Sequence, residues 1–150
     1  MEYTSHLVWQ GSTASGYRAY SREHRVVARP ATSELRLSAD AQFRGDPTLL
    51  NPEQLVVMAA SSCQLLSFLA VAARAGIDVV DYEDEATGFM TADGDGRLSL
   101  TTIDLSPVIT VAPGIDADAV RRMVDEAHEE CYIANSLRAE VRVDAEVVTA

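Results

Sequence analysis

The strongest constraint on the fold of this 150-residue chain is a long uncharged stretch from Gln54 to Ala73. Asn51 is a favourable N-cap, Pro52 suits the first helical position and Gln54 can complete a capping box, so a helix is predicted to begin here. Gly76 predicts that it ends near residue 75. The stretch is apolar on nearly every face but contains Ser and Gln side chains. We therefore expect a helix inside the protein core or a subunit interface, not a membrane span.

Extended segments and a second helix are predicted around this first helix. The antiparallel pair is expected in residues 3–10 and 17–28, a third strand in 34–37, an ordered loop in 39–50, a hairpin in 81–111 that turns at 93–96, a helix beginning near Asp116 that carries Cys131, and a half-buried strand in 139–148. The order β-β-(β)-α-β-β-α-β predicts an α+β fold with two core helices packed on antiparallel sheets. Length and composition predict a single domain over residues 1–150.

The charge of the chain limits the partners that it is expected to bind. Twelve basic and 23 acidic residues give a formal net charge of −11, so nucleic acid and anionic membrane surfaces should be repelled. The first residues carry neither a basic nor an apolar signal region, which favours a cytoplasmic location. The two cysteines, Cys63 and Cys131, are too few for a disulfide scaffold. Composition alone is compatible with two small buried apolar residues.

Several short motifs give these cysteines a more specific interpretation. The motifs are Asn51-Pro52-Glu53-Gln54-Leu55, Ala59-Ala60-Ser61-Ser62-Cys63, His128-Glu129-Glu130-Cys131 and Ala134-Asn135-Ser136. In this combination the chain resembles the superfamily of osmotically inducible protein C and organic hydroperoxide resistance protein. The resemblance covers almost the whole chain and implies an intertwined homodimer that reduces organic hydroperoxides through a cysteine pair, with no cofactor. In many members a proline follows the second cysteine, where this chain has Tyr132.

The resemblance implies separate roles for the two cysteines. A thiolate at Cys63 would attack a peroxide oxygen, and Cys131 would condense with the resulting sulfenic acid to form a disulfide. An external dithiol, either a lipoylated protein or a small thiol, would then reduce the pair. Apolar residues around the cysteines could line a pocket for an organic hydroperoxide, although the core is an equally good place for some of them. These residues are Met58, Leu65, Leu66, Phe68, Tyr132 and Ile133.

A cation must lower the pKa of the attacking thiol, and the resemblance implies an arginine paired with Glu53. Arg44 is the first candidate, with Arg22 and Arg18 as alternatives. In one continuous helix Glu53 and Cys63 would lie about 15 Å apart, at about 1.5 Å per residue. Either the helix breaks near Ser61, or the Glu–Arg pair of one subunit serves the cysteines of the other.

Two other classes of function are possible. His128 and Cys131 could bind a metal together with Cys63 or His24, but the chain has no second close pair of ligands, so no metal is expected. The remaining alternative is a module without catalytic turnover, which binds an apolar ligand or senses oxidation through its cysteines. Turnover with a dithiol would distinguish the enzyme from this module.

Overall fold

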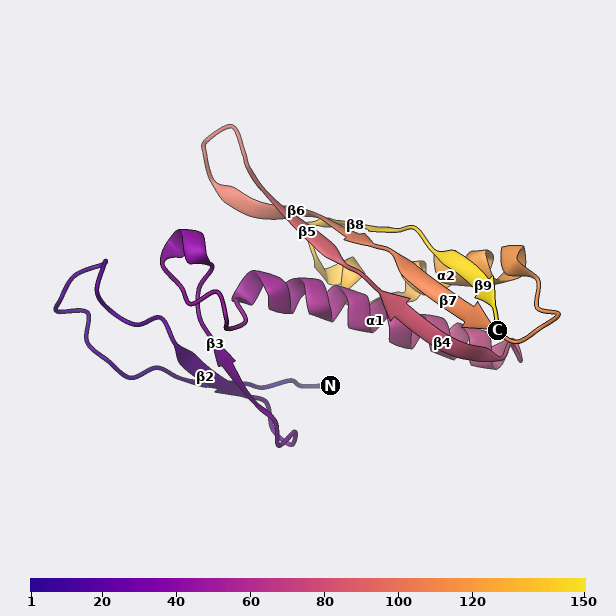
Figure 1. The fold of residues 1–150 in the computed structure, drawn as a ribbon, viewed down its shortest axis with the longest axis horizontal. Coiled ribbons are helices and arrows are strands. Elements are labelled where there is room, and N and C mark those ends of the chain that lie inside the picture. The colour runs from indigo at the N-terminus through magenta and orange to yellow at the C-terminus, as the bar shows by residue number, and fades with distance from the viewer. The chain divides into compact units, whose positions relative to one another are not determined.

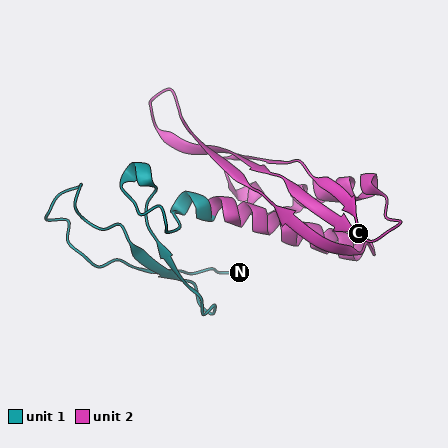
Figure 2. Ribbon diagram, in the orientation of Figure 1, with its two compact units in different colours: residues 1–55 teal, residues 56–150 magenta.

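The computed structural model describes residues 1–150 and has two α helices among nine strands, in agreement with the predicted α+β class (Figure 1). The chain divides into two compact units, residues 1–55 and residues 56–150 (Figure 2). The longer of the two helices begins in the first unit and continues into the second. The single domain over residues 1–150 stays a prediction.

The first unit contains a small antiparallel sheet in the order β1-β2-β3. Its strands are β1 (His6–Val8), β2 (His24–Val27) and β3 (Glu34–Leu37). The strand predicted from residue 17 begins only at His24, because local turns occupy the residues before it. Ala19 N donates to Gly16 O at 3.1 Å, and the Arg22 guanidinium binds the carbonyl oxygens of Tyr17 and Tyr20. These local contacts take the place of sheet hydrogen bonds.

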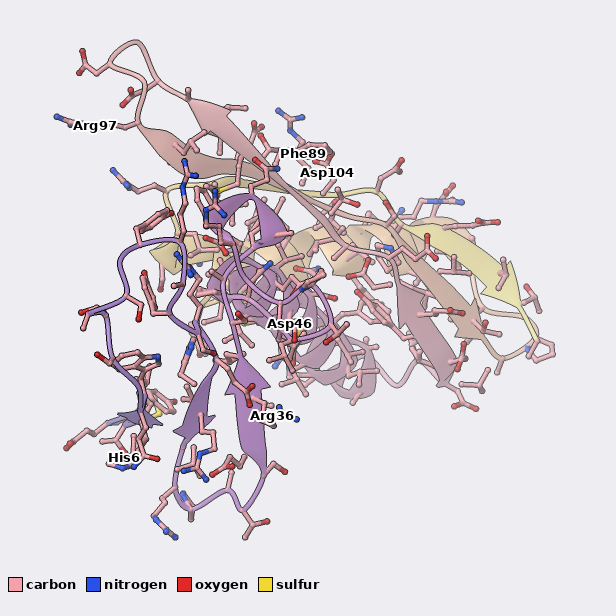
Figure 3. All side chains as sticks on the ribbon, turned by 60° about the vertical axis from the view of Figure 1, so that its left-hand side comes forward. His6, Arg36, Asp46, Phe89, Arg97 and Asp104 are labelled. Atoms are coloured by element: carbon pink, nitrogen blue, oxygen red, sulfur yellow. The ribbon has the colours of Figure 1, made fainter.

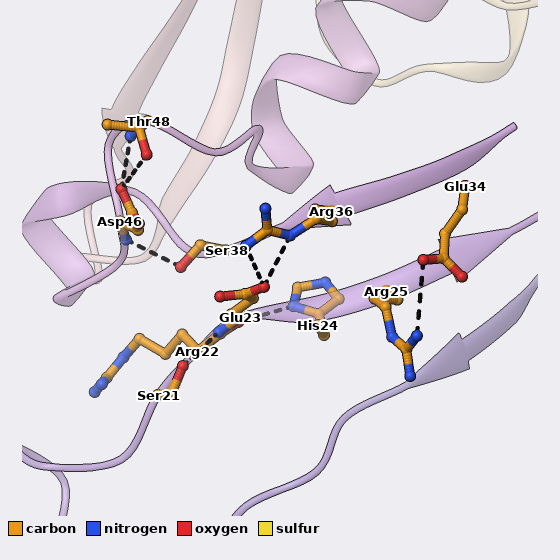
Figure 4. Close-up of polar contacts among 10 residues, drawn as sticks. All are labelled: Ser21, Arg22, Glu23, His24, Arg25, Glu34, Arg36, Ser38, Asp46 and Thr48. Atoms are coloured by element: carbon orange, nitrogen blue, oxygen red, sulfur yellow. Dashed lines mark hydrogen bonds and ion pairs between the residues drawn. The ribbon is translucent and has the colours of Figure 1, made fainter.

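The loop between β3 and the first helix is ordered, as predicted, by side chains that bind its backbone. Asp40 caps the short 3-10 helix η1 (Ala41–Phe43) by accepting from Gln42 N at 2.7 Å. Ser38 Oγ accepts from Asp46 N at 3.0 Å, and two hydrogen bonds from Thr48 lower the pKa of Asp46 (Figure 4). The loop therefore reaches the first helix along a defined path.

Helix α1 (Pro52–Arg74) is continuous and begins at the predicted cap. Asn51 N donates to Gln54 Oε1 at 3.0 Å and Gln54 N donates to Asn51 Oδ1 at 2.8 Å, which confirms the capping box. By length and composition alone this helix could cross a membrane. One face packs into the core of the second unit through Ala60, Gln64, Phe68, Val71 and Ala72. The prediction of a core helix therefore holds for this face, while much of the remaining apolar surface is exposed in the single chain.

The second unit places its helices on one side of two three-stranded sheets (Figure 1). The sheets have the orders β4-β7-β9 and β5-β6-β8, with strands β4 (Val79–Asp84), β5 (Thr87–Ala92), β6 (Leu98–Leu105), β7 (Pro107–Val111), β8 (Glu140–Val143) and β9 (Glu146–Thr149). The predicted β5–β6 hairpin is confirmed, and its turn carries Arg97 (Figure 3). The pairs β6–β8 and β7–β9 are parallel, so both sheets are mixed where antiparallel sheets were expected.

The predicted extended segments 81–111 and 139–148 are each divided at the points where the chain passes from one sheet to the other. Asp84 ends β4 and accepts hydrogen bonds from Ser106 N at 2.8 Å, through Oδ1, and from Ser61 Oγ of α1 through Oδ2. Ser106 separates β6 from β7, and Asp144 separates β8 from β9 while donating from its N–H to Leu105 O at 2.9 Å. The predicted strand over 139–148 is therefore two strands, because the backbone changes its partner at this boundary.

Helix α2 (Ala117–Glu130) begins near Asp116, as predicted, and the Asp116 side chain caps it by accepting from Asp118 N at 3.2 Å. Its buried stripe consists of Val120, Val124 and Ala127, and it packs with Phe68 of α1 and with strand β7. Cys131 was predicted within this helix but lies just beyond it, as the C-cap residue in an extended conformation (φ −71°, ψ 106°). The helix therefore ends at Glu130, directly before the second cysteine.

Candidate functional site

The second unit brings its two cysteines together although 68 residues separate them in the sequence. Cys63 lies in α1 with a half-buried side chain, and Cys131 caps α2 with only 1% of its surface exposed. Both are free thiols, and the Cys63 thiol lies close enough to that of Cys131 to raise its pKa. The structure therefore brings the two sequence-predicted cysteines together, one half-buried and one almost wholly buried.

The environment of Cys131 favours its neutral form. Burial raises the pKa of this thiol above its ordinary value, and the contact with Cys63 raises it further. The backbone N–H groups of Ala134 and Ile133 donate toward the sulfur and lower the pKa, but burial is the larger effect. Cys131 is consequently a protonated thiol at neutral pH, held beside a more accessible one.

A short turn fixes the backbone after Cys131, at the position where the resemblance would imply a proline and this chain has Tyr132. Asn135 N donates to Cys131 O at 3.0 Å, and Asn135 Nδ2 donates to Glu129 O at 2.9 Å. Ser136 Oγ donates to Tyr132 O at 2.6 Å. The 3-10 helix η2 (Ala134–Ser136) thus folds back on the end of α2, and side-chain hydrogen bonds hold the turn.

Gln64 follows Cys63 in the sequence and had no predicted role. Its side chain is 1% exposed, and Nε2 donates to Val124 O of α2 at 3.2 Å, so it links the two helices that carry the cysteines. Its Oε1 atom is buried without a hydrogen-bond partner, as is Nδ1 of His128. The sequence signal for a role of Gln64 was an amide side chain in the middle of an apolar helix, because buried polar groups usually have a structural or functional reason.

Arg22, one of the predicted activating arginines, is held within the first unit. Its guanidinium donates to Tyr20 O at 2.8 Å and to Tyr17 O at 2.7 Å. The same group stacks on the rings of Tyr20 and Tyr17, with its central carbon 4.1 Å and 4.8 Å from their centroids. Cation–π contacts of this kind restrict the side chain as well as stabilising it.

Arg44 differs from Arg22 because it has no partner. It is exposed, adopts a left-handed conformation (φ 64°) after η1, and forms no ion pair or side-chain hydrogen bond. Arg18 is also exposed without such a partner. Glu53 is half-buried in the first turn of α1 and pairs with none of the three arginines. All four residues belong to the first unit and both cysteines to the second (Figure 2).

The continuity of α1 removes one of the two arrangements left open by the sequence. The helix does not break near Ser61, so ten residues of regular helix separate Glu53 from Cys63. At about 1.5 Å per residue this separation is about 15 Å. One arginine therefore cannot contact both side chains of the same chain.

The residues considered for a metal site are not gathered into one. No group of three or more His, Cys, Asp or Glu side chains is placed to hold a metal ion. His24 lies in β2 of the first unit, where its Nδ1 is 2.9 Å from Arg22 O. His128 contributes its backbone oxygen to the cap of α2 by accepting from Cys131 N at 3.2 Å.

The fold and its two thiols define a class of α+β protein with one cysteine on a long central helix and a second at the end of the next helix. The chain belongs to the OsmC-like protein family, whose family model matches residues 45–146. It is similar over 97% of its length to an OsmC-like protein of unknown function from Vibrio cholerae, with 28% identity, 99% of that chain covered and a TM-score of 0.87.

Two curated relatives have names that refer to peroxides. The chain is 25% identical over 137 residues to peroxiredoxin OsmC of Escherichia coli, covering 91% of this chain and 90% of the relative. It is 28% identical over 144 residues to an organic hydroperoxide resistance protein of Xanthomonas axonopodis, covering 94% and 91%. The expected superfamily is therefore confirmed over nearly the full length of both relatives.

Proposed function

We propose that this protein is a cysteine-dependent peroxidase that reduces organic hydroperoxides to alcohols. The single observation that carries the proposal is the contact between a partly accessible thiol, Cys63, and a buried thiol, Cys131, that a short turn holds in place. The names of the relatives in Escherichia coli and Xanthomonas axonopodis support the same class of reaction.

The reaction assigns one step to each thiol. The Cys63 thiolate attacks one peroxide oxygen, the O–O bond breaks, and the other oxygen leaves as an alcohol after it takes up a proton. Cys63 is then a sulfenic acid. The Cys131 sulfur attacks the Cys63 sulfur, water leaves, and a disulfide replaces the two thiols. An external dithiol supplies the two electrons that restore them.

Activation of Cys63 is proposed to come from Arg44 and Glu53 of a partner subunit in a homodimer. A regular helix separates Glu53 from Cys63 of its own chain, whereas an intertwined dimer supplies a second copy of both side chains. Arg44 is preferred over Arg22 because its guanidinium is unpaired, while Arg22 is bound by two carbonyls and two rings. A guanidinium beside Cys63 would favour the thiolate.

The apolar side chains near the cysteines favour an organic substrate over hydrogen peroxide. Met58 and Leu66 on α1 and Tyr132 after Cys131 are exposed, at 45%, 64% and 79% respectively, and are free to contact an apolar group. Phe68 is fully buried in the core and Ile133 packs on a core cluster, so neither is proposed to line a pocket.

A single-turnover experiment tests the proposed reaction. The reduced protein is mixed with cumene hydroperoxide or hydrogen peroxide, and peptide mass mapping follows both cysteines. The wild type should form the Cys63–Cys131 disulfide, and faster with the organic peroxide. Cys63→Ser should lose the reaction, whereas Cys131→Ser should react once and then over-oxidise. Equal loss of the first step in both variants would contradict these roles, and oxidation without turnover on added dithiothreitol would indicate a redox-sensing module.

The activating arginine is identified by comparing three matched substitutions. Arg44→Gln should slow oxidation of Cys63 by about 100-fold, the usual scale for removing a preorganised charge from an active site. Arg22→Gln and Arg18→Gln should have much smaller effects. Stopped-flow measurement of the first oxidation step separates this effect from changes in the later reduction. A dominant loss in either of the other two variants would transfer the role to that arginine.

A further inference from the structure

The two thiols differ so much in accessibility that they cannot be equivalent when their disulfide is reduced. Only 1% of Cys131 is exposed, and a second subunit could only lower this value. Cys63 is half-buried, and under the proposed function a peroxide must already reach it. Thiol–disulfide exchange requires an incoming sulfur to approach one sulfur of the disulfide while the other leaves. The path used by the peroxide therefore ends at the sulfur of Cys63.

We propose that the external reductant attacks Cys63 and that Cys131 leaves as a thiolate. The backbone N–H groups of Ile133 and Ala134 stabilise this leaving thiolate by donating toward its sulfur. This inference rests on the proposed function for the formation of the disulfide in the natural cycle. It names the sulfur that forms the mixed disulfide and the groups that stabilise the departing charge.

Each electron pair is accounted for in two exchanges. The thiolate of a dithiol reductant forms a bond to the Cys63 sulfur, the Cys63–Cys131 bond breaks, and its electron pair leaves on Cys131, which then takes up a proton. The second thiol of the reductant loses its proton and attacks the reductant sulfur bound to Cys63. Cys63 leaves as a thiolate and the reductant becomes a cyclic disulfide. A monothiol lacks the second internal step and needs another molecule.

Two effects oppose each other at the leaving group. Burial raises the pKa of Cys131, and thiols of high pKa leave slowly. The N–H groups of Ile133 and Ala134 act in the other direction by donating toward the sulfur. Access decides between the two sulfurs, because a poor leaving group slows attack on Cys63 whereas burial blocks attack on Cys131. The turn held by Asn135 and Ser136 keeps Cys131 inside.

The attacked sulfur is identified by trapping the mixed disulfide in the full-length wild-type protein. Diamide oxidises the cysteines without a peroxide, and intact mass verifies the disulfide. Limiting glutathione is then added, the reaction is quenched with N-ethylmaleimide in denaturing guanidinium chloride so that buried thiols are also labelled, and peptides are mapped. Glutathione should lie on Cys63 and maleimide on Cys131, with at least about tenfold preference for this arrangement, as expected when only one sulfur is accessible.

A pair of variants at position 133 tests whether backbone N–H groups stabilise the leaving Cys131 thiolate. Ile133→Pro removes one donor at a residue whose φ of −70° suits proline, and Ile133→Ala shortens the side chain but keeps the donor. Reduction of the diamide-formed disulfide by dithiothreitol should be several-fold slower in the proline variant than in the alanine variant. Circular dichroism checks that both variants are folded, and the wild-type mapping does not depend on either.

The possible outcomes separate this inference from the proposed function. Glutathione mainly on Cys131 would overturn the inference and leave the peroxidase proposal intact. Formation of the disulfide with diamide but not with cumene hydroperoxide would overturn the peroxidase proposal, while the mapping would still decide the attacked sulfur. Failure of both diamide and cumene hydroperoxide to form the disulfide would overturn both.

Discussion

The two cysteines have identical side chains, but they differ in accessibility because one is buried more deeply than the other. Cys131 is nearly inaccessible and its neutral form is favoured, while Cys63 keeps part of its surface exposed. The family resemblance predicted this pair and a separate role for each member, but the sequence does not show how much of each side chain is exposed, because accessibility depends on segments far away along the chain. Gln64 was overlooked for the same reason, since only the packed structure shows that its amide binds Val124 of the other helix.

The raised pKa of Cys131 predicts when this thiol can be alkylated. In Cys63→Ser, burial remains the main cause, so the midpoint for reaction with iodoacetamide should lie above the ordinary thiol value of 9.0. Because the folded protein holds the proton more tightly than the unfolded chain, the associated stability is full below the unfolded pKa and is lost as the pH rises through the folded pKa. Mass spectrometry after timed alkylation measures the midpoint. The thiol of free cysteine is the control, and a midpoint below 9.0 would contradict the environment assigned to Cys131.

Two substitutions of Gln64 should change the free energy of unfolding by very different amounts. Gln64→Met keeps the approximate volume and removes the unpartnered buried oxygen, so the free energy of unfolding should change by less than about 1 kcal/mol. Gln64→Glu buries a carboxylate and should cost about 3 kcal/mol or more at neutral pH. The folded pKa of that carboxyl would be raised, so this penalty should shrink as the pH falls. Urea unfolding at two pH values measures both effects, and similar losses in the two variants would contradict the buried placement.

At the scale of elements, the parts that depend on neighbouring residues were predictable and those that depend on distant partners were not. The capping box at Asn51 and the start of α2 near Asp116 depend on side chains within three residues, and both predictions are confirmed. The division between β8 and β9 and the parallel pairing of both strands arise from contacts with residues about 40 positions earlier. Likewise, the sequence does not predict that α2 ends before Cys131, because the apolar spacing of the helix continues through that residue.

The contact between β5 and α1 can be tested at a glycine. A Cβ added to Gly88 would lie 2.5 Å from Val57 Cγ2, and a valine in a helix is restricted in χ1 and cannot easily turn away. Gly88→Ala should therefore cost about 1–3 kcal/mol, as is typical of overpacking. Adding Val57→Ala should recover part of this loss in a double-mutant cycle. Gly94→Ala is the control, because a Cβ there meets nothing within 4 Å. Additive effects at positions 57 and 88 would rule out the contact.

At the scale of the whole molecule, the apolar surface of α1 is larger than one chain covers. Met58, Leu66 and Leu69 are 45%, 64% and 39% exposed, although the surrounding helix is almost wholly uncharged. Their spacing places them on one side of the helix, opposite the buried residues that pack in the second unit. Exposed apolar surfaces of this kind usually mark an interface. We propose that this face packs against a second copy of the same chain, in the homodimer proposed for the activation of Cys63.

The dimer proposed for this face predicts a response to one charge. Leu69→Glu would place a carboxylate in the interface, where it cannot be solvated, so size-exclusion chromatography with light scattering should show a monomer for this variant and a dimer for the wild type. Val80→Glu is the matched control, because Val80 is 53% exposed at an irregularity of β4 and lies outside α1. If activation of Cys63 depends on the partner's Arg44, Leu69→Glu should also lose peroxide reduction while Val80→Glu keeps it. A monomeric wild type, or a monomeric variant with full activity, would show that each chain activates its own thiol.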